Sequence, residues 1–275
     1  MNKNIGWHNG KWQDIESINL SIKNRGLKFS DGIFETILIK DNKAILLNEH
    51  IERFNKTLLL LNFQITLEKN FIMSLIQEGI NKLSLSSNQL GSIRINYSRG
   101  INIDRTIKIH SDYNRFKVSN IWIEFHEINL NLNPISVEIS QTEKRNEYSL
   151  LSRCKTFSYN QSIQVLIEAN KNNFEDGLLL NTQNELCCGT TFNLLLKRND
   201  IWLTPRKESG CFPGIMVSKL LKLKWIKEDY ILPLFYENDI LIAINSLSCK
   251  QIIQVNDLKL KSNFDIKNFW DRLYI

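Results

Sequence analysis

The sequence predicts a two-domain α+β protein, because strand and helix patterns alternate in both halves of the chain. Segments rich in β-branched and aromatic residues, such as Gly32–Lys40, predict strands. Apolar residues at spacings of three and four, as at Ile51, Phe54 and Leu58, predict helices. A length of 275 residues fits one large domain or two modest ones. The mixture of patterns favours two α+β domains.

The first half contains strand and helix signals in succession. Asn9-Gly10 lies between two aromatic segments and predicts the turn of a β-hairpin. A second helical repeat covers Ile72–Leu83. Further strands are expected over Ala44–Leu47, Gly91–Gly100 and Val118–Phe125. A small α/β N-terminal domain over residues 1–127 is the simplest account of this order.

An asparagine-rich segment over residues 128–134 separates the two halves. Its apolar–polar alternation is compatible with a short strand, but asparagine is a poor strand former and Pro134 would end the strand. We therefore expect an interdomain linker, with a strand as the alternative. Residues 135–275 would form a larger, barrel-like α+β domain. Its expected elements are a helix over Tyr159–Ile167, a strand over Gly177–Leu180 and a hairpin over Asn193–Leu203.

Composition narrows the classes of function. No stretch approaches the ~18 apolar residues of a membrane helix, and the first residues lack the apolar core of a secretory signal. A cytoplasmic location is therefore expected. The net charge of +6 comes from dispersed basic residues, so we expect neither nucleic acid nor a membrane as a partner. The five cysteines form no Cys-x-x-Cys motif and the four histidines are scattered, so no disulfide frame or metal site is expected.

Several short motifs occur in an informative order. Lys155 lies in Cys154–Asn160, at the start of a predicted helix. The other motifs are Arg25–Thr36, Glu49–Phe54, Cys188–Asn193, Thr204-Pro205 and Pro213–Ile215. Together they resemble the fold-type IV pyridoxal-phosphate (PLP) enzymes of the class IV aminotransferase family, which includes branched-chain and D-amino-acid aminotransferases and aminodeoxychorismate lyase. The resemblance implies the two-domain fold-type IV architecture, an N-terminal strand motif at Arg25–Thr36, PLP as cofactor and a homodimer.

The resemblance also implies roles for individual residues. Lys155 would be the Schiff-base lysine, because the cofactor needs an amine that forms an imine, leaves and then moves protons. Thr36 would face the substrate as a second catalytic residue. Arg53 would hold the cofactor phosphate with its planar guanidinium. Further cofactor contacts would come from Tyr159, Cys188, Thr190, Asn193, Ile215, Met216 and Ser246. A small anionic substrate would be bound by Arg94 and Arg99.

Simpler interpretations of the same residues stay open. A lysine in a basic chain is usually exposed. Arg53 could instead pair with Glu49, one helical turn away. Tyr159 could be a core residue, and the placement of Thr36 and Arg94 could reflect ordinary alternation along strands.

Cys188 departs from the family pattern. Most members have a glutamate at this position, which pairs with the pyridine nitrogen of the cofactor. A neutral thiol is a weak partner for that nitrogen, and Glu185 lies three residues earlier. Met216-Val217 likewise replaces a common Thr-Arg pair, so the phosphate site loses a hydroxyl and a charge. A weaker electron sink is better suited to a lyase whose product becomes aromatic than to an aminotransferase.

Two segments favour the lyase within this family. Ile93–Gly100 resembles the substrate-side strand of aminodeoxychorismate lyase, and Asn245–Leu247 resembles its last phosphate-binding turn. We therefore predict a PLP-dependent 4-amino-4-deoxychorismate lyase, which eliminates pyruvate and yields p-aminobenzoate for folate synthesis. The alternatives are a branched-chain or D-amino-acid aminotransferase and a catalytically weak PLP-binding protein.

Overall fold

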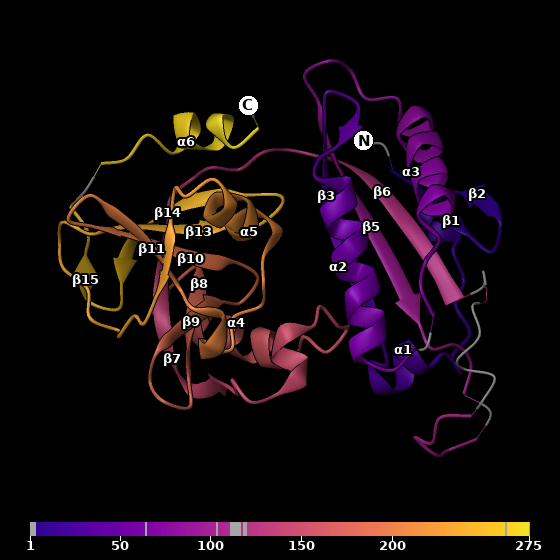
Figure 1. Ribbon diagram of the computed structural model, residues 1–275, viewed down its shortest axis with the longest axis horizontal. Helices are drawn as coiled ribbons and strands as arrows, with labels where there is room; N and C mark the ends of the chain where they lie inside the picture. Colours follow the sequence, from indigo (N-terminus) through magenta and orange to yellow (C-terminus); the bar gives the residue numbers. More distant parts are fainter. Residues whose placement is uncertain are drawn as a thin grey trace. The chain divides into compact units, whose positions relative to one another are not determined.

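The chain forms two compact units, each containing strands and helices (Figure 1). The computed structural model describes residues 4–63, 65–102, 104–110, 117, 120–261 and 263–274. Unit 1 comprises Met1–Leu130 and Cys154–Ser158, and unit 2 comprises Asn131–Arg153 and Tyr159–Ile275. The predicted two-domain α+β class is confirmed. The contacts group residues 154–158, the segment around Lys155, with unit 1.

Unit 1 is built on a six-stranded antiparallel sheet with the order β2-β1-β6-β5-β3-β4. The strands are β1 (Asn4–His8), β2 (Lys11–Gln13), β3 (Gly32–Lys40), β4 (Lys43–Ala44), β5 (Leu90–Ser98) and β6 (Ile121–Ile128). The helices are α1 (Arg25–Phe29), α2 (Leu47–Leu60) and α3 (Lys69–Leu83), with a 3₁₀ turn, η1, at Ile15–Ser17. The predicted hairpin forms, and Asn9 and Gly10 both adopt positive φ in its turn, at 51° and 78°.

The two faces of this sheet have different residues. On one face, inward side chains of β3, β5 and β6 pack against α2 and α3, and this core includes Ile37, Ile93 and Phe125. Alternation along the strands places Phe34, Thr36 and Arg94 on the other face. The sheet thus has one face for the core, and the other face carries Thr36 and Arg94.

Three local expectations for unit 1 differ from the structure. The strand expected over Ala44–Leu47 is shorter, because Leu46 adopts a left-handed φ of 53° and α2 begins at Leu47. Arg25–Phe29, expected as part of a strand motif, is a short helix capped by the Asn24 side chain. The strand expected from Val118 begins at Ile121, and Val118 and Ser119 lie outside the described residues.

Unit 2 contains a nine-stranded mixed sheet with the order β12-β11-β10-β13-β14-β7-β8-β9, and β15 pairs with β14. Its strands are β7 (Ile135–Arg145), β8 (Asp176–Asn181), β9 (Leu186–Gly189), β10 (Asn193–Arg198), β11 (Ile201–Pro205), β12 (Lys227–Asp229), β13 (Ile240–Ile244), β14 (Cys249–Val255) and β15 (Leu258–Lys259). Its helices are α4 (Asn160–Lys171), α5 (Ile215–Lys222) and α6 (Ile266–Arg272), with 3₁₀ turns η4 (Leu150–Arg153) and η5 (Lys207–Ser209). Residues 129–134 lie in no strand.

The buried face of α4 differs from the one that the spacing of isoleucines predicts. Ile163 and Ile167 are 47% and 42% exposed, whereas Val165 and Ala169 are buried. Val165 packs where Gly177 of β8 has no side chain: a Cβ on Gly177 would lie 2.4 Å from the Val165 Cγ1. Close packing against the strand therefore selects the helix face.

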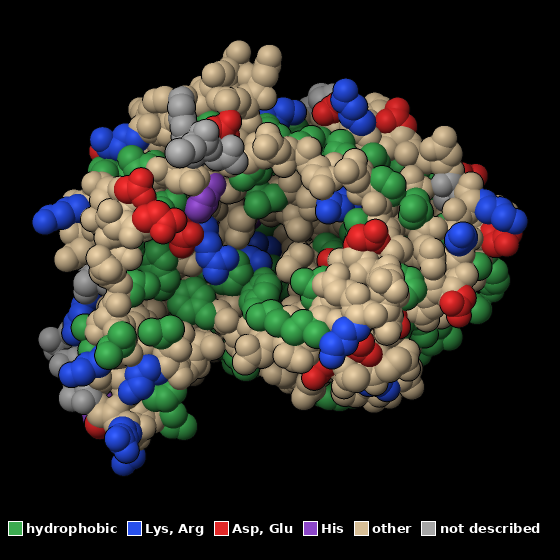
Figure 2. All heavy atoms as spheres, turned by 180° about the vertical axis from the view of Figure 1, so that it is seen from behind, with side chains coloured by type: hydrophobic (Ala, Val, Ile, Leu, Met, Phe, Trp, Pro, Cys, Tyr) green, Lys and Arg blue, Asp and Glu red, His purple; other side chains and the backbone are tan. Residues whose placement is uncertain are grey.

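The surface of the described residues carries side chains of both charges. On the face shown in Figure 2, acidic side chains lie among the basic ones. All five cysteines are buried and unpaired. Across the described ranges, no cluster of three or more metal-ligating side chains occurs. None of the described helices has the length and apolar character needed to cross a membrane.

The packing of α3 gives a testable prediction. Gly79 of α3 faces the sheet, and a Cβ there would lie 2.2 Å from the Phe125 ring. Gly79→Ala should destabilise the protein by about 1–3 kcal/mol, because overpacking outweighs the gain of ~1 kcal/mol in helix propensity. The exposed Ser74 of the same helix provides a control, and Ser74→Ala should change stability by less than about 0.5 kcal/mol. Urea unfolding measures both, and a stabilised Gly79→Ala variant would contradict this packing.

Candidate active site

Lys155 lies in a segment that pairs with β3 through backbone hydrogen bonds. The N–H of Phe34 donates to the Lys155 carbonyl at 3.0 Å, and the N–H of Phe157 donates to the Gly32 carbonyl at 3.0 Å. A Cβ on Gly32 would lie 2.1 Å from the Phe157 ring, so only glycine permits this close approach. The pairing fixes the Lys155 backbone beside the sheet of unit 1.

Lys155, Arg94 and Thr36 are associated with the same face of the sheet. The Lys155 Nζ lies 4.4 Å from the centroid of the Phe34 ring, and the Arg94 Cζ lies 3.6 Å from the same centroid. Thr36 is the cross-strand partner of Arg94, so the two side chains are neighbours on this face. Arg94 Nε donates to Asn96 Oδ1 at 2.8 Å, which orients its guanidinium. The structure therefore brings together three of the residues singled out in the sequence.

Glu124 adds a carboxylate to this face that the motifs did not indicate. Its Oε1 accepts hydrogen bonds from Asn96 Nδ2 at 2.9 Å and from Trp122 Nε1 at 3.2 Å. Burial alone would raise the pKa of Glu124, but His126, Arg94 and Asn96 lower it below its ordinary value. The carboxylate is therefore ionised at neutral pH. The sequence signal for this carboxylate is the alternation of Trp122, Glu124 and His126 along β6. That signal becomes informative only when the pairing of β6 with β5 is known.

Arg53 is held by a buried carboxylate, and its partner is not Glu49. Arg53 Nε and Nη2 donate to the two oxygens of Glu35 at 2.7 and 2.6 Å. His50 Nδ1 lies 2.7 Å from Glu35 Oε2. Burial would raise the pKa of Glu35, but Arg53 and His50 overcome it and lower the value from 4.5 to about 2. This bidentate pair fixes the direction of the Arg53 guanidinium.

Arg99 is held by contacts within unit 1, whereas the resemblance implied that it binds the substrate. Its Nε donates to both Asp31 oxygens at 3.1 Å, and its Nη atoms donate to the carbonyls of Leu61 and Asn62 at 2.9 and 3.0 Å. The guanidinium also lies 3.8 Å from the Phe63 ring centroid. Because the side chain is buried and these contacts engage all three nitrogens, we assign Arg99 to holding the end of α2 against the sheet.

In unit 2, Asn193 lies against the N-terminus of α5. Asn193 Nδ2 donates to the Phe212 carbonyl at 2.9 Å, and a Cβ on Gly214 would lie 1.9 Å from Asn193 Oδ1. Glycine is thus required at the N-cap of α5, and no side chain caps this helix. The backbone N–H groups of Ile215 and Met216 belong to the first turn, where an anion is favoured by the helix dipole. Both side chains are buried.

The turn between β13 and β14 lies beside this region. Asn193 pairs with Ile244, the last residue of β13, and the turn that follows contains Ser246. Asn245 Oδ1 accepts from the backbone N–H of Leu247 at 2.8 Å, which folds the turn around its own side chain. Thr190, also expected at the cofactor, donates to Asp176 Oδ1 at 2.7 Å.

Cys188 is a neutral thiol beside a guanidinium. The adjacent Cys187 thiol and burial raise the pKa of Cys188 well above its ordinary value. Arg145 Nη2 lies 3.9 Å from the Cys188 sulfur, and its Nη1 donates to Gln161 at 3.0 Å. Burial lowers the pKa of Arg145, but its neighbours Cys188, Cys187 and Tyr159 raise it overall. Sequence reasoning missed Arg145, because it ends a strand that no motif marked.

Glu185 does not supply the carboxylate that Cys188 lacks. It is buried in a separate cluster, where it accepts hydrogen bonds from Arg206 at 3.0 Å, from Asn181 Nδ2 at 3.1 Å and from the Ser209 hydroxyl. Position 188 therefore combines a neutral thiol with a nearby cation.

The expected site residues are distributed over both units. Unit 1 contains Thr36, Arg53, Arg94, Arg99 and Lys155. Unit 2 contains Tyr159, Cys188, Thr190, Asn193, Ile215, Met216 and Ser246. Within unit 1 the structure groups Lys155 with Thr36 and Arg94, and within unit 2 it groups Asn193 with the start of α5 and the turn that contains Ser246.

Comparison with known proteins identifies the family. Residues 32–255 match the model of the amino-transferase class IV family. A provisionally named branched-chain-amino-acid aminotransferase of Methanocaldococcus jannaschii is 24% identical over 221 residues, which cover 78% of this chain and 73% of that protein. D-alanine aminotransferase of Staphylococcus epidermidis is 32% identical over 93 residues, which cover 34% of this chain and 32% of that protein.

Solved structures share the fold over nearly the whole chain. The branched-chain aminotransferase of Escherichia coli gives a TM-score of 0.83 at 16% identity, covering 97% of this chain and 92% of that one. A provisionally named 4-amino-4-deoxychorismate lyase of Legionella pneumophila gives 0.76 at 20% identity, covering 94% of each chain. A hypothetical aminotransferase of Mycobacterium tuberculosis in its PLP-bound form gives 0.81 at 14% identity, covering 98% and 97%.

The chain belongs to the class IV amino-transferase family of PLP enzymes. The match covers β3 through β14 and therefore includes both units. The chain is accordingly an aminotransferase or a lyase of this class.

The Arg53–Glu35 pair predicts a specific dependence of stability on pH. Because the pKa of Glu35 falls from 4.5 to about 2 on folding, the pair stabilises the protein above pH 4.5 by roughly 3 kcal/mol, and this is lost as the pH falls through about 2. Glu35→Gln should destabilise the protein by about 3–5 kcal/mol at pH 7, since a buried guanidinium loses its partner. The deficit relative to wild type should shrink as the pH falls from 4.5 towards 2.

Glu52→Gln on the exposed face of α2 is the matched control. Urea unfolding between pH 7 and pH 3 measures each free energy of unfolding. A deficit for Glu35→Gln that stays constant over this range would contradict the assignment.

Proposed function

We propose that the protein is a PLP-dependent 4-amino-4-deoxychorismate lyase. The observation that carries the proposal is the position of Lys155, whose Nζ lies 4.4 Å from the Phe34 ring with Arg94 on the same ring and Thr36 opposite Arg94. An amine that can move protons is thereby associated with a guanidinium that can pair with a substrate carboxylate. Such a pairing suits a small anionic substrate.

The residues of the chain fit a cofactor that carries a phosphate group. Arg53 offers an oriented guanidinium, and the uncapped N-terminus of α5 offers the backbone N–H groups of Ile215 and Met216. Ser246, in the adjacent turn, offers a hydroxyl. Gly214 is required where it approaches Asn193, because a Cβ there would collide with the Asn193 side chain. These residues support PLP binding by this chain.

The proposed chemistry assigns proton transfers to Lys155. Bound PLP would supply the electron sink for the amine-bearing carbon of the substrate. Lys155 would accept the proton from that carbon and later donate a proton to the departing enolpyruvyl group. Pyruvate would leave, and the ring would become p-aminobenzoate. Arg94 would orient a substrate carboxylate, and Thr36 would contact the substrate beside it.

Cys188 favours the lyase over an aminotransferase. A neutral thiol next to the Arg145 guanidinium provides no carboxylate to keep the cofactor nitrogen protonated. Formation of an aromatic product gives the lyase a driving force that transamination lacks. The likeness of Asn245–Leu247 to the lyase turn supports the same choice.

Two other functions remain candidates. A branched-chain or D-amino-acid aminotransferase is supported by the Methanocaldococcus and Staphylococcus relatives. A catalytically weak PLP-binding protein is motivated by Cys188 alone. The homodimer, the small anionic substrate and the cytoplasmic location are further parts of this proposal, and we propose neither a nucleic-acid nor a membrane partner.

Lys155→Ala tests the catalytic assignment. The purified wild type should turn yellow with PLP and release p-aminobenzoate from aminodeoxychorismate. The variant should lose the yellow absorption band and at least about a thousandfold in turnover, because no other group replaces the amine. Lys171→Ala, at the exposed end of α4, should retain both. A wild type that binds PLP, makes no p-aminobenzoate and converts PLP to its pyridoxamine form with valine or D-alanine would instead establish the aminotransferase.

Cys188→Glu tests the role of the thiol, with Cys188→Ser as a neutral control of similar size. The new carboxylate would lie near Arg145 and should change the absorption spectrum of bound PLP. It should also raise the rate of the amino-acid half-reaction by about tenfold or more, since it would strengthen the electron sink. The serine variant should match wild type. An unchanged spectrum and unchanged lyase turnover in Cys188→Glu would refute this role.

A further inference from the structure

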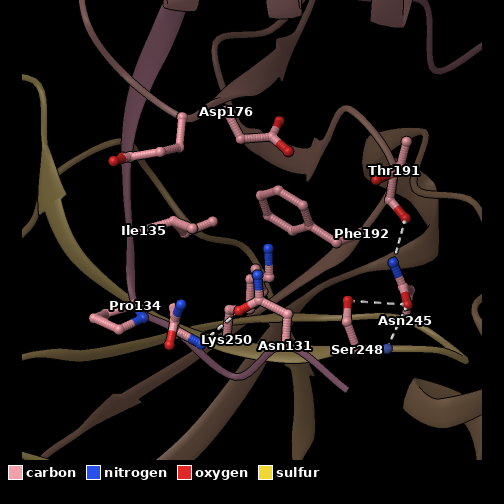
Figure 3. Close-up of a pocket in the computed structure, with 12 residues that line it drawn as sticks. Asn131, Pro134, Ile135, Asp176, Thr191, Phe192, Asn245, Ser248 and Lys250 are labelled. Atoms are coloured by element: carbon pink, nitrogen blue, oxygen red, sulfur yellow. Dashed lines mark hydrogen bonds between the residues drawn. The ribbon is translucent and has the colours of Figure 1, made fainter. Parts of the chain in front are cut away.

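A pocket of about 400 Å³ opens at one end of the sheet of unit 2 (Figure 3). It lies where β13 ends and where β14, β7 and β8 begin. Its lining residues are Asn131, Asn133, Pro134, Ile135, Glu175, Asp176, Thr191, Phe192, Ala243, Asn245, Ser248 and Lys250. This volume is in the range of pockets that bind small molecules.

The pocket is on the opposite face of the sheet from Asn193. Ala243 lines the pocket, and its neighbour Ile244 is the cross-strand partner of Asn193. Adjacent residues of a strand point to opposite faces. Phe192, which precedes Asn193, likewise lines the pocket and belongs to the core cluster of that face. The pocket therefore opens on the face opposite Asn193, and it shares Asn245 with the turn that contains Ser246.

Lys250 brings a positive charge into this pocket. It is half-buried at the start of β14, opposite Ala243. Among the residues that the structure describes, none forms a hydrogen bond or an ion pair within 4 Å with its ammonium group. A partly buried ammonium group of this kind gains free energy when a ligand supplies an anion.

Asp176 and Glu175 bring negative charge to the same pocket. Asp176 Oδ1 accepts from the Thr190 hydroxyl and from the backbone N–H of Gly177, both at 2.7 Å, and the backbone N–H of Thr190 also interacts with this carboxylate. Burial raises the pKa of Asp176, and Lys250 acts against this increase. Hydrogen bonds from Ser136 lower the pKa of Glu175, and Lys250 adds a smaller contribution in the same direction. Lys250 thus influences the pKa of both carboxylates, but it forms no ion pair within 4 Å with either of them.

The rest of the pocket is divided between apolar and amide groups. Phe192, Ile135 and Ala243 form an apolar side, and Figure 3 shows the Phe192 ring between Asp176 and the Lys250 side. Asn131 and Asn133 supply side-chain amides from the segment before β7. A ligand here would meet a cation, carboxylates and an apolar surface.

We propose that this pocket binds a small zwitterion, namely a free α-amino acid. Its carboxylate pairs with Lys250, its ammonium group pairs with the Asp176 carboxylate, and its side chain packs against Phe192 and Ile135. A simple anion would meet the two carboxylates and a simple cation would meet Lys250, so only a ligand with both charges satisfies the pocket. The proposal does not depend on the reaction proposed above.

The probe for this site is α-aminoisobutyrate, which has no α-hydrogen and so cannot lose a proton to Lys155. Isothermal titration of the full-length protein should show binding. Isobutyrate, which lacks the ammonium group, and isopropylamine, which lacks the carboxylate, should each bind about tenfold more weakly or worse, since each loses one charged contact.

Variants locate the binding. Lys250→Met and Asp176→Asn should each weaken α-aminoisobutyrate about tenfold or more. Lys259→Met, on the neighbouring strand β15, removes an exposed lysine and should leave binding unchanged. Arg94→Met removes the guanidinium assigned to the substrate carboxylate in unit 1, so it separates binding at that site from binding at the pocket of unit 2. Thermal unfolding of each variant checks that it is folded.

Three results would overturn the proposal. The first is the absence of α-aminoisobutyrate binding to the wild type. The second is equal binding of isobutyrate, which would make the pocket a simple anion site. The third is loss of binding in Arg94→Met with retention in folded Lys250→Met, which would move the ligand to the face of unit 1.

Discussion

Backbone pairing between β3 and the segment of Lys155 is the constraint on which the candidate active site depends. The hydrogen bonds of Phe34 and Phe157 place this segment alongside β3 of unit 1, although it lies more than 110 residues later in the sequence. Gly32 permits the approach, because any side chain there would collide with Phe157. With the backbone fixed in this way, the Lys155 amine lies against Phe34, and Arg94 lies against the same ring.

Buried charge gives this framework its electrostatic character. In unit 1, Glu35 neutralises and orients Arg53, while Asn96 and Glu124 surround Arg94. In unit 2, by contrast, Cys188 is a neutral thiol next to Arg145. The available carboxylate, Glu185, is engaged by Arg206 and Ser209. We propose that this thiol is a weak partner for the cofactor nitrogen.

Local patterns in the sequence were sufficient for many elements, because their causes are local. The Asn9-Gly10 hairpin was predicted from turn chemistry, and β3 was predicted from its β-branched and aromatic residues. The buried face of α4 was not, since it depends on the space above Gly177 in a distant strand. For the same reason, the sequence motifs indicated Lys155 and Arg94 but not Arg145 or Glu124, whose positions depend on strand register. Arg99 was indicated by a motif, but the motif does not reveal that its guanidinium is already hydrogen-bonded to Asp31 and to the Leu61 carbonyl.

The central claim is that Lys155 is the lysine that bonds to PLP. Borohydride reduction of the PLP-loaded protein, followed by peptide mass spectrometry, tests this most directly, because reduction makes the lysine–cofactor bond permanent. The account predicts a pyridoxyl group on the peptide that contains Cys154–Asn160, attached to Lys155. A label on another lysine, or no label after loading with PLP, would contradict it.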